Sequence, residues 1–178
     1  MNKNKELLKY YERCNELVDY NKETGVFTRK ISRGGRRAGE LVGHNHRSGY
    51  KFMGVTIDGK YKTIALHRLA WFMSYGVLPK VIDHIDMDKS NNKIRNLRDC
   101  SHSQNNMNRP RQSNNTSGVK GVHYNKNKGS WASYIIVNGR QKHLCQTKDF
   151  EYACFARLEA EKKYHGEFMY KEENEAET

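Results

Sequence analysis

Apolar side chains at helical spacing define two segments in the N-terminal half of the chain. Between residues 3 and 19 they recur every three or four positions, at Leu7, Leu8, Tyr11, Cys14, Leu17 and Val18. This period predicts an amphipathic helix with one buried face. The segment 67–76, HRLAWFMSYG, is largely apolar and ends in glycine, which predicts a second, short and mostly buried helix.

Strand-like runs separate these two helices. GVFTRK (25–30) and GELVG (39–43) flank a basic, glycine-rich loop, and each run predicts a short strand. The runs YKFMGVTI and KYKTIAL are joined by Asp58-Gly59, a pair that a tight type I′ turn favours. They therefore predict a β-hairpin.

The pattern changes after residue 108. The segment 109–117 has the proline and polar content of a linker. Beyond it, VKGVHY, SWASYIIV and RQKHLCQ alternate like strands, and Asn138-Gly139 joins the last two as a second hairpin. A final helix at about 149–165 begins near Thr147 or Asp149, either of which can cap it.

These elements predict an α+β fold in two domains. We expect the first domain over residues 1–108, the linker over 109–117 and the second domain over 118–168. An acidic tail, 169–178, closes the chain. The final helix carries small residues along one side, which let a helix pack closely on a sheet: Ala153, Ala156 and Ala160.

The balance of charge favours a polyanionic partner. Lys and Arg number 32 against 20 Asp and Glu, a formal net charge of +12. Such an excess attracts nucleic acid and releases counterions when phosphates are neutralised. An ordinary basic surface is the alternative that charge alone leaves open. We expect double-stranded DNA as the partner, with Arg36 and Arg37 of the basic loop lying along its backbone.

Composition also bounds the location and the cofactors. No run reaches the roughly 18 apolar residues that a membrane span needs, and the first residues lack a signal-peptide core. The four cysteines are widely spaced, with no CxxC pair, so we expect neither structural zinc nor disulfides. These features predict a cytoplasmic protein without a membrane partner.

Candidate chemistry is concentrated in VIDHIDMDKSNNKIRNLRDCSHSQNNMNR. A short apolar run ends in Asp83-His84, a loop rich in Asp and Asn follows, and IRNLR resembles a second strand. Ser101 and Gln104 have the spacing of a capping box that opens a helix carrying Asn105. Two strands and a helix around a loop can gather these side chains in one small volume.

Phosphodiester hydrolysis needs a base for the attacking water and a divalent metal ion to stabilise charge. His84 can supply the base, while Asp83 and Asn105 offer the hard oxygen ligands that suit one Mg²⁺ or Mn²⁺ ion. An amide at Asn96 can fix the loop and orient the histidine, because a catalytic imidazole needs one tautomer and one direction.

The span 64–108 resembles the HNH nucleases, especially their phage and intron-encoded branch. Their motifs stand in order, as His67-Arg68-Leu69, Asp83-His84-Ile85-Asp86, Asn91-Asn92, Asn96-Leu97-Arg98 and Gln104-Asn105. The resemblance implies a ββα-metal fold and a homing-type DNA endonuclease. It implies that His84 is the general base, that Asp83 and Asn105 hold one metal ion, and that Asn96 is the structural middle residue. Asn105 stands where other branches have histidine, which makes the metal site richer in oxygen.

From Gly118 to about Gly166 the sequence is similar to the Apetala2/ethylene-response-factor DNA-binding domain. GVKGV, WASYI, Asn138-Gly139, Leu144 and the alanine-rich helix carry the similarity. It implies a three-stranded antiparallel sheet in the major groove, with the helix packed behind it. Cys145 replaces a frequent glycine, and the first strand offers Lys120, His123 and Asn125 in place of base-reading arginines.

Cations and flat rings on the strands are the expected DNA contacts of this second domain. Trp131 has an alternative role as a core anchor between sheet and helix. Together with arginines of the first domain, the candidate contacts are Arg36, Arg37, Arg68, Arg98, Lys120, His123, Tyr124, Trp131, Tyr134, Arg140 and Lys142.

Several histidines and acidic residues allow other interpretations. The letters His44-Asn45-His46 spell HNH, but three consecutive residues cannot form a dispersed ββα site. Asp86 and Asp88 lack the glutamate that an EF-hand loop requires. His67 suits a structural role under the site. The competing function is a DNA-binding regulator with an inactive nuclease half, and a nuclease toxin is disfavoured. A monomer on DNA has one centre, so a nick is the default product.

Overall fold

The computed structural model describes residues 3–170, which fold as two compact units. The first unit runs to Cys100 and the second begins at Ser101. The division therefore falls ahead of the predicted linker, 109–117, and the helix predicted after Ser101 belongs to the second unit. Apart from Met169 and Tyr170, the acidic tail lies outside the described residues.

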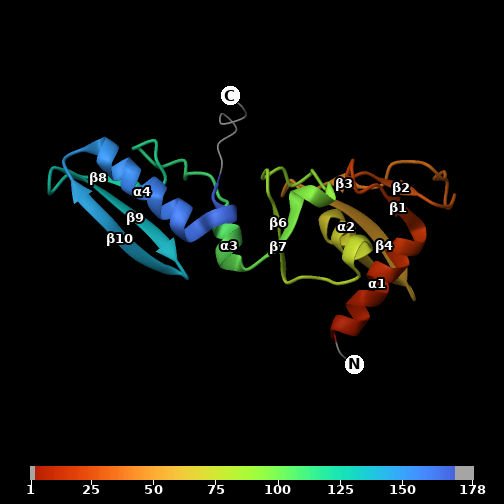
Figure 1. Cartoon of the computed structure of the whole chain (residues 1–178). Helices are drawn as coiled ribbons and strands as arrows, with labels where there is room; N and C mark the ends of the chain where they lie inside the picture. Colours follow the sequence, from red (N-terminus) through yellow and green to blue (C-terminus); the bar gives the residue numbers. More distant parts are fainter. Residues whose placement is uncertain (1–2, 171–178) are drawn as a thin grey trace. The chain divides into compact units, whose positions relative to one another are not determined.

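The first unit contains two helices and three small antiparallel sheets (Figure 1). The sheets pair β1 with β2, β3 with β4 and β5, and β6 with β7. In chain order the elements are α1 Lys3–Leu17, β1 Val18–Tyr20, β2 Phe27–Arg29, β3 His44–Asn45, β4 Lys51–Ile57, β5 Lys60–Ala65, α2 Leu66–Tyr75, β6 Val81–His84, the 3-10 turn η1 Ile94–Asn96 and β7 Leu97–Cys100.

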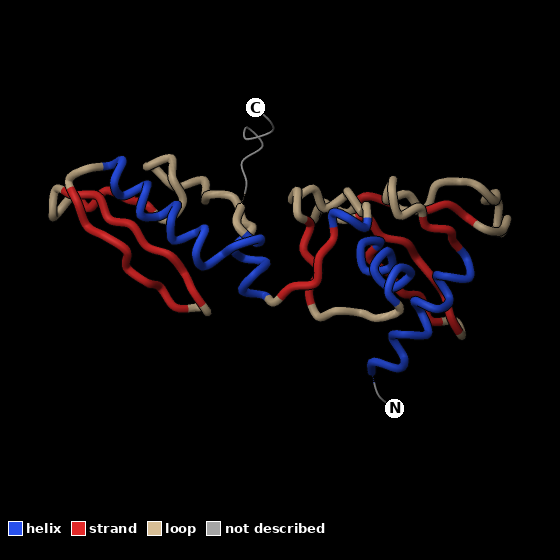
Figure 2. The backbone as a smooth tube through the Cα atoms, in the orientation of Figure 1, coloured by secondary structure: helices blue, strands red, loops and turns tan. Residues whose placement is uncertain are grey.

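The core of the first unit lies where α1 and α2 pack on the β3–β4–β5 sheet (Figure 2). Cys14 and Val18 from the end of α1 and the start of β1 are fully buried, as is Leu69 from α2. Full burial of one such leucine contributes roughly 1.5–3 kcal/mol of transfer free energy. The predicted periodicity of both helices is confirmed, and their buried faces pack against the β3–β4–β5 sheet.

The β4–β5 hairpin forms as predicted, with Asp58 and Gly59 at φ 49° and 72° in its turn. The strand predicted at 39–43 was wrong, because this segment contributes only a single bridge from Leu41 to Thr28. Gly39 and Gly43 adopt φ 83° and 123°, and these positive values interrupt extended backbone at both ends of the segment.

The β6–β7 hairpin carries the Asp83-His84 and Asn96-Leu97-Arg98 parts of the predicted motif. Its register places Asp83 opposite Arg98 and His84 opposite Leu97. The second strand begins at Leu97 and not at Ile94, because Ile94–Asn96 forms a 3-10 turn closed by the Asn96 N–H to Lys93 carbonyl bond of 2.9 Å. Consequently the loop before β7 ends in a tight turn that directs Asn96 back toward the loop.

The second unit is a three-stranded sheet with a long helix, in the order predicted. Ser101 and Gln104 form the predicted capping box at α3, and the side chain of Asp149, not Thr147, caps the N terminus of α4. Antiparallel strands are ordered β10–β9–β8. The elements are α3 His102–Met107, β8 Val122–Asn125, β9 Ser130–Val137, β10 Arg140–Thr147, α4 Phe150–His165 and the 3-10 turn η2 Gly166–Phe168.

In the described part of the chain, no helix is both long and apolar enough to cross a membrane.

Gly25 permits a close approach between the β1–β2 connection and the loop before η1. Its φ is 73°, and a Cβ there would lie 2.5 Å from the Lys93 nitrogen and 2.7 Å from the Asn92 carbonyl carbon. Backbone cannot yield as a flexible side chain does, so this contact allows only glycine.

We therefore expect Gly25→Ala to lower the free energy of unfolding by about 2 kcal/mol or more, from strain plus steric overlap. Gly76→Ala is the matched control, since Gly76 has φ 72° with no atom within 4 Å of a Cβ. The control should cost about 1 kcal/mol from strain alone. Equal losses in urea unfolding would show that the close approach is unimportant.

Candidate active site

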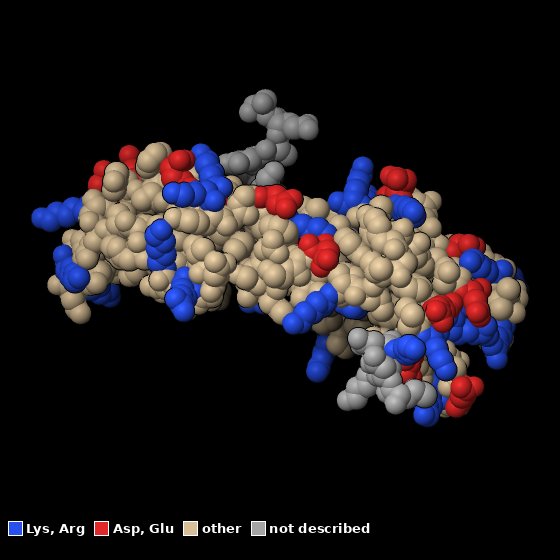
Figure 3. All heavy atoms as spheres, turned by 60° about the horizontal axis from the view of Figure 1, so that its bottom comes forward, with Lys and Arg blue, Asp and Glu red and all other residues tan. Residues whose placement is uncertain are grey.

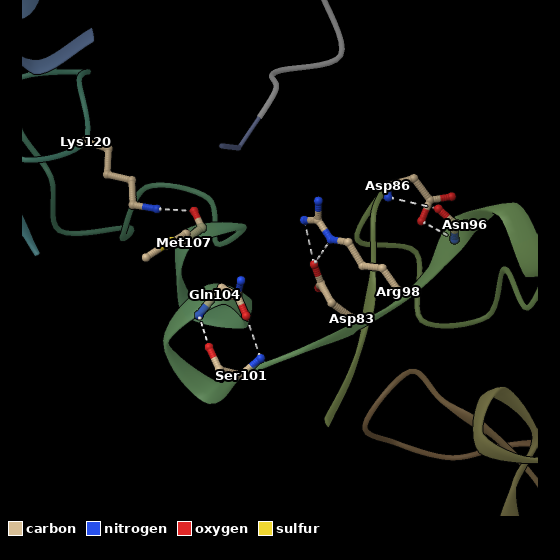
Figure 4. Close-up of polar contacts among 8 residues, drawn as sticks. All are labelled: Asp83, Asp86, Asn96, Arg98, Ser101, Gln104, Met107 and Lys120. Carbon is tan, nitrogen blue, oxygen red and sulfur yellow. Dashed lines mark hydrogen bonds and ion pairs between the residues drawn. The ribbon is translucent and has the colours of Figure 1, made fainter. Parts of the chain in front are cut away.

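Asp83 and His84 end strand β6 and are both buried, with exposed fractions of 6% and 3%. The Arg98 guanidinium donates two hydrogen bonds to Asp83 Oδ2, from Nε at 2.9 Å and Nη2 at 2.7 Å (Figure 4). Antiparallel pairing puts these two side chains opposite one another, so the strands themselves create the ion pair. Arg98, expected to contact DNA, thus compensates the charge of the buried carboxylate.

The His84 imidazole lies among aromatic and amide side chains. Its Nε2 is 3.5 Å from Asn92 Oδ1, and its ring centroid is 5.7 Å from Tyr50 and 5.3 Å from His67. Burial lowers the pKa of His84 and outweighs the opposing influence of Asn92 and of the nearby carboxylates. The imidazole is therefore biased toward its neutral form, which is the form a general base requires.

His67 supports His84 from α2. Burial, followed by the neighbouring His84, lowers the pKa of His67 to about 3. Its ring also packs 4.8 Å from Tyr50. A histidine that stays neutral and packed between rings fits the structural role predicted for this residue.

Asn96 holds the loop that follows His84. Its Oδ1 accepts the Asp86 N–H at 3.1 Å, and its Nδ2 donates to Asp86 Oδ1 at 2.8 Å (Figure 4). The same Nδ2 donates to the Asn91 carbonyl at 2.9 Å. These three bonds support the predicted loop-fixing role. They do not involve the imidazole, however, and the amide facing His84 within this unit is that of Asn92.

Asp86 and Asp88 are committed to the same loop. Asp86 Oδ1 also accepts the Asp88 N–H at 2.9 Å, and Asp88 Oδ1 accepts the Ser90 N–H at 2.9 Å. Hydrogen bonds from Ser90 lower the pKa of Asp88. Among the described residues, no group of three or more His, Cys, Asp or Glu side chains is placed to hold a metal ion.

Asn92 is a site residue that the sequence analysis named only as part of the Asn91-Asn92 motif, without a role at the site. Its exposed fraction is 2%, and its carbonyl accepts the Tyr20 hydroxyl at 2.7 Å. The bond to Tyr20 joins residues 72 apart in the sequence, and Asn92 Oδ1 lies 3.5 Å from His84 Nε2. No local sequence pattern predicts this contact, and the only signal is the position of Asn92 in the Asn91-Asn92 motif.

Asn105 lies on α3, in the second unit, with its N–H bonded to the Ser101 carbonyl at 3.0 Å. Two of the predicted arginines of the first unit, Arg36 and Arg37, are exposed. Arg68 instead donates from Nη2 to the Pro79 carbonyl at 2.9 Å, a partly buried contact that anchors the segment after α2.

The three-stranded sheet divides the predicted DNA contacts between its two faces. His123 and Tyr134 share the face away from α4, with ring centroids 5.9 Å apart. Trp131 packs 4.5 Å from Phe150 at the start of α4, as its alternative role predicted. By register and contact the helix side holds Tyr124, Trp131, Arg140 and Lys142, and the Lys142 ammonium donates to the Tyr164 hydroxyl at 2.6 Å.

Lys120 lies before the sheet and is turned inward. Its Nζ donates to the carbonyls of Met107 at 3.0 Å and Arg109 at 2.7 Å, and burial lowers its pKa. The face away from α4 gains two residues that were not predicted, Gln141 and His143, opposite Ile136 and Tyr134. Counting alternate residues from Tyr134 across the Asn138-Gly139 turn would have found them.

Residues 65–107, from the end of β5 through α3, match the family described as HNH endonuclease. The chain belongs to this family. It is 30% identical over 110 residues to protein 3.8 of Escherichia phage T7, a match that covers 61% of this chain and 90% of that protein. A solved structure of the HNH homing endonuclease I-HmuI is similar with a TM-score of 0.41 and 21% identity, covering 84% of this chain and 85% of that one.

The Asn96–Asp86 pair should be measurable as a coupled unit. We expect Asn96→Ala to reduce the free energy of unfolding by about 2–4 kcal/mol, because three hydrogen bonds are lost. Asp86→Ala should also destabilise, and the double variant should cost at least about 0.5 kcal/mol less than the sum. Asn127→Ala, at an exposed turn position, is the control. Additive losses would contradict the proposed coupling.

His67 should make stability depend on pH. Its folded-state pKa of about 3 lies below the usual 6.5, so between these values the unfolded chain binds a proton that the folded chain does not. Stability is therefore retained above pH 6.5 and decreases as the pH falls toward 3. In urea unfolding from pH 4.5 to 7, His67→Phe should reduce the slope of the unfolding free energy against pH, and the reduction should correspond to the uptake of up to about one proton on unfolding. Parallel curves for the two proteins would refute it.

Proposed function

We propose that this protein is a metal-dependent endonuclease that hydrolyses one phosphodiester bond of double-stranded DNA, with a nick as its product. The observation that carries this proposal is the pair Asp83 and His84, buried together at the end of β6 beside a loop that Asn96 fixes. This arrangement lies within the span that matches the HNH family. A loop of fixed shape is what a general base needs in order to keep one direction.

His84 is the general base in this proposal. In the tautomer in which His84 Nε2–H donates a hydrogen bond to Asn92 Oδ1, the lone pair of the imidazole resides on Nδ1. Nδ1 then takes the proton of the attacking water. Because burial lowers the pKa of His84, the base is unprotonated at neutral pH. Asn92 and the rings of Tyr50 and His67 keep it in position.

The donor atoms suit one divalent cation with hard oxygen preference. Asp83 supplies a carboxylate whose Oδ2 is bound to Arg98, and a carboxylate can bridge a guanidinium on one oxygen and a cation on the other. Asn105 would supply an amide oxygen. Mg²⁺ or Mn²⁺, if held by these residues, would supply charge stabilisation to the phosphate and to the departing 3′ oxygen. Arg98 keeps the orientation of Asp83 fixed.

The DNA contacts are proposed to come from both units. The net charge of +12 supplies the general attraction, and basic side chains are visible on both units in Figure 3. In the second unit, the face of the sheet away from α4 is proposed to approach the groove with His123, Tyr134, Gln141 and His143. A phage homing role is proposed on the likeness of the motif to that branch of the family.

Plasmid nicking tests the proposal. We expect supercoiled plasmid to be nicked with Mg²⁺ or Mn²⁺, to stay intact with EDTA, and to be nicked about a hundredfold or more slowly by His84→Ala. His46→Ala is the matched control, because His46 lies in the exposed segment His44-Asn45-His46, outside the proposed site. This variant should nick plasmid at the wild-type rate.

Undiminished nicking by His84→Ala would remove the proposed mechanism. Tight DNA binding without cleavage, over several metals and substrates, would instead favour the DNA-binding regulator with an inactive nuclease half.

A further inference from the structure

Residues 29–40 form a narrow hairpin, where the sequence predicted only a basic loop. The Arg29 N–H donates to the Glu40 carbonyl and the Gly39 N–H to the Arg29 carbonyl, each at 2.9 Å. Nearer the tip, Arg33 and Arg36 exchange backbone bonds of 2.9 and 3.2 Å. These bonds give the segment one defined shape, so its charges are presented at fixed positions.

The tip of this hairpin consists of backbone alone. Gly34 and Gly35 occupy the turn with φ 60° and 78°, and no atom lies within 4 Å of where a Cβ would stand on either. Positive φ at both central positions is the type I′ turn, which keeps two strands closely paired. The tip is therefore thin and open to solvent.

The cations beside the tip lie in a stretch without acidic residues, which ends at Glu40. No Asp or Glu occurs from Thr24 to Gly39. Arg36 and Arg37 are exposed, and in the described chain neither side chain forms an ion pair. Arg33 differs, because it lines a shallow pocket beside Glu12 and Glu16 of α1. On the first strand, Lys30 Nζ lies 3.7 Å from Asp19 Oδ1, and Arg29 is partly buried. The exposed positive charge without an ion pair therefore lies on the second strand, at Arg36 and Arg37.

We propose that this hairpin inserts its Gly34-Gly35 tip into the minor groove of DNA, with Arg36 and Arg37 as the contacting cations and A·T-rich sequence as its preferred site. The inference rests on the proposed function, which makes DNA the substrate. The minor groove is only about 6 Å wide, which a tip without side chains can enter. Narrow A·T-rich grooves also concentrate negative potential that attracts arginine.

Binding to three duplexes of equal length tests this placement, in EDTA so that no cleavage occurs. One duplex is A·T-rich, one is G·C-rich, and the third has inosine in place of every guanine of the second. Inosine removes the minor-groove amino group and leaves the major-groove edge unchanged. We expect wild type to bind the A·T-rich and inosine duplexes at least threefold more tightly than the G·C duplex.

Arg36→Ala/Arg37→Ala should abolish this preference and reduce the slope of log affinity against log salt by about 1–2. Gly34→Asn preserves a type I′ turn and the charge but adds a side chain at the tip, so it should lose the preference with little change in salt slope. Lys60→Ala is the control, since Lys60 follows the Asp58-Gly59 turn of the other hairpin of this unit. It should keep the preference.

Three results would overturn the inference: no preference in wild type, a preference that survives in Arg36→Ala/Arg37→Ala, or an inosine duplex that binds like the G·C duplex. None of these results bears on the proposed nuclease activity, because its dependence on metal and on His84 is measured separately by plasmid nicking. Failure of wild type to bind any duplex would defeat the proposed function as well.

Discussion

The site depends on the hydrogen bonds between Asn96 and the loop that leads away from His84. Residues 85–93 have no helix or strand of their own, so their shape comes from side-chain hydrogen bonds and from backbone bonds such as that of the Ile85 N–H to the Asn96 carbonyl at 2.9 Å. Asn96 donates to Asp86 and Asn91 and accepts from the Asp86 backbone, which closes the loop onto the start of β7. The Tyr20 hydroxyl then fixes Asn92 from the β1–β2 side. The closed loop and the bond from Tyr20 together hold Asn92 Oδ1 3.5 Å from the His84 imidazole.

Burial determines the electrostatics of the same region. Two histidines in ring contact, His67 and His84, both have lowered pKa values, so neither contributes a stable positive charge there. Arg98, whose side chain is 13% exposed, forms an ion pair with Asp83. A buried carboxylate without such a partner would be costly by several kcal/mol. The fold therefore stabilises one negative charge and one neutral base side by side, and this difference is the chemical basis of the proposed hydrolysis.

Local sequence signals predicted most of the fold because the elements here are short and closed by their own turns. Asp58-Gly59, Asn138-Gly139 and the Ser101 capping box were all confirmed. The failures are of another kind. The strand at 39–43 is interrupted by glycines whose φ values no alternation pattern reveals. The burial of Asn92 follows from contacts with Tyr20 and with the backbone beside Gly25, which are distant in sequence. The DNA contacts were predicted from residue type alone, without strand register, and the predicted set therefore includes residues from both faces of the sheet.

Register also separates two physical contributions to DNA binding. On the face of the three-stranded sheet away from α4, the strand residues include no Lys, Arg, Asp or Glu, and among them are His123, Tyr134, Gln141 and His143. The strand cations Arg140 and Lys142 lie on the helix side, and Lys142 is bonded to Tyr164. Such a face can offer hydrogen bonds and stacking to base edges, but it supplies little of the attraction to phosphate that dominates affinity. That attraction must come from cations outside the face, and exposed arginines such as Arg36 and Arg37 are suited to provide it. The proposed contacts of the sheet face and of the hairpin arginines thus lie on different elements, which makes their contributions to DNA binding separable by mutation.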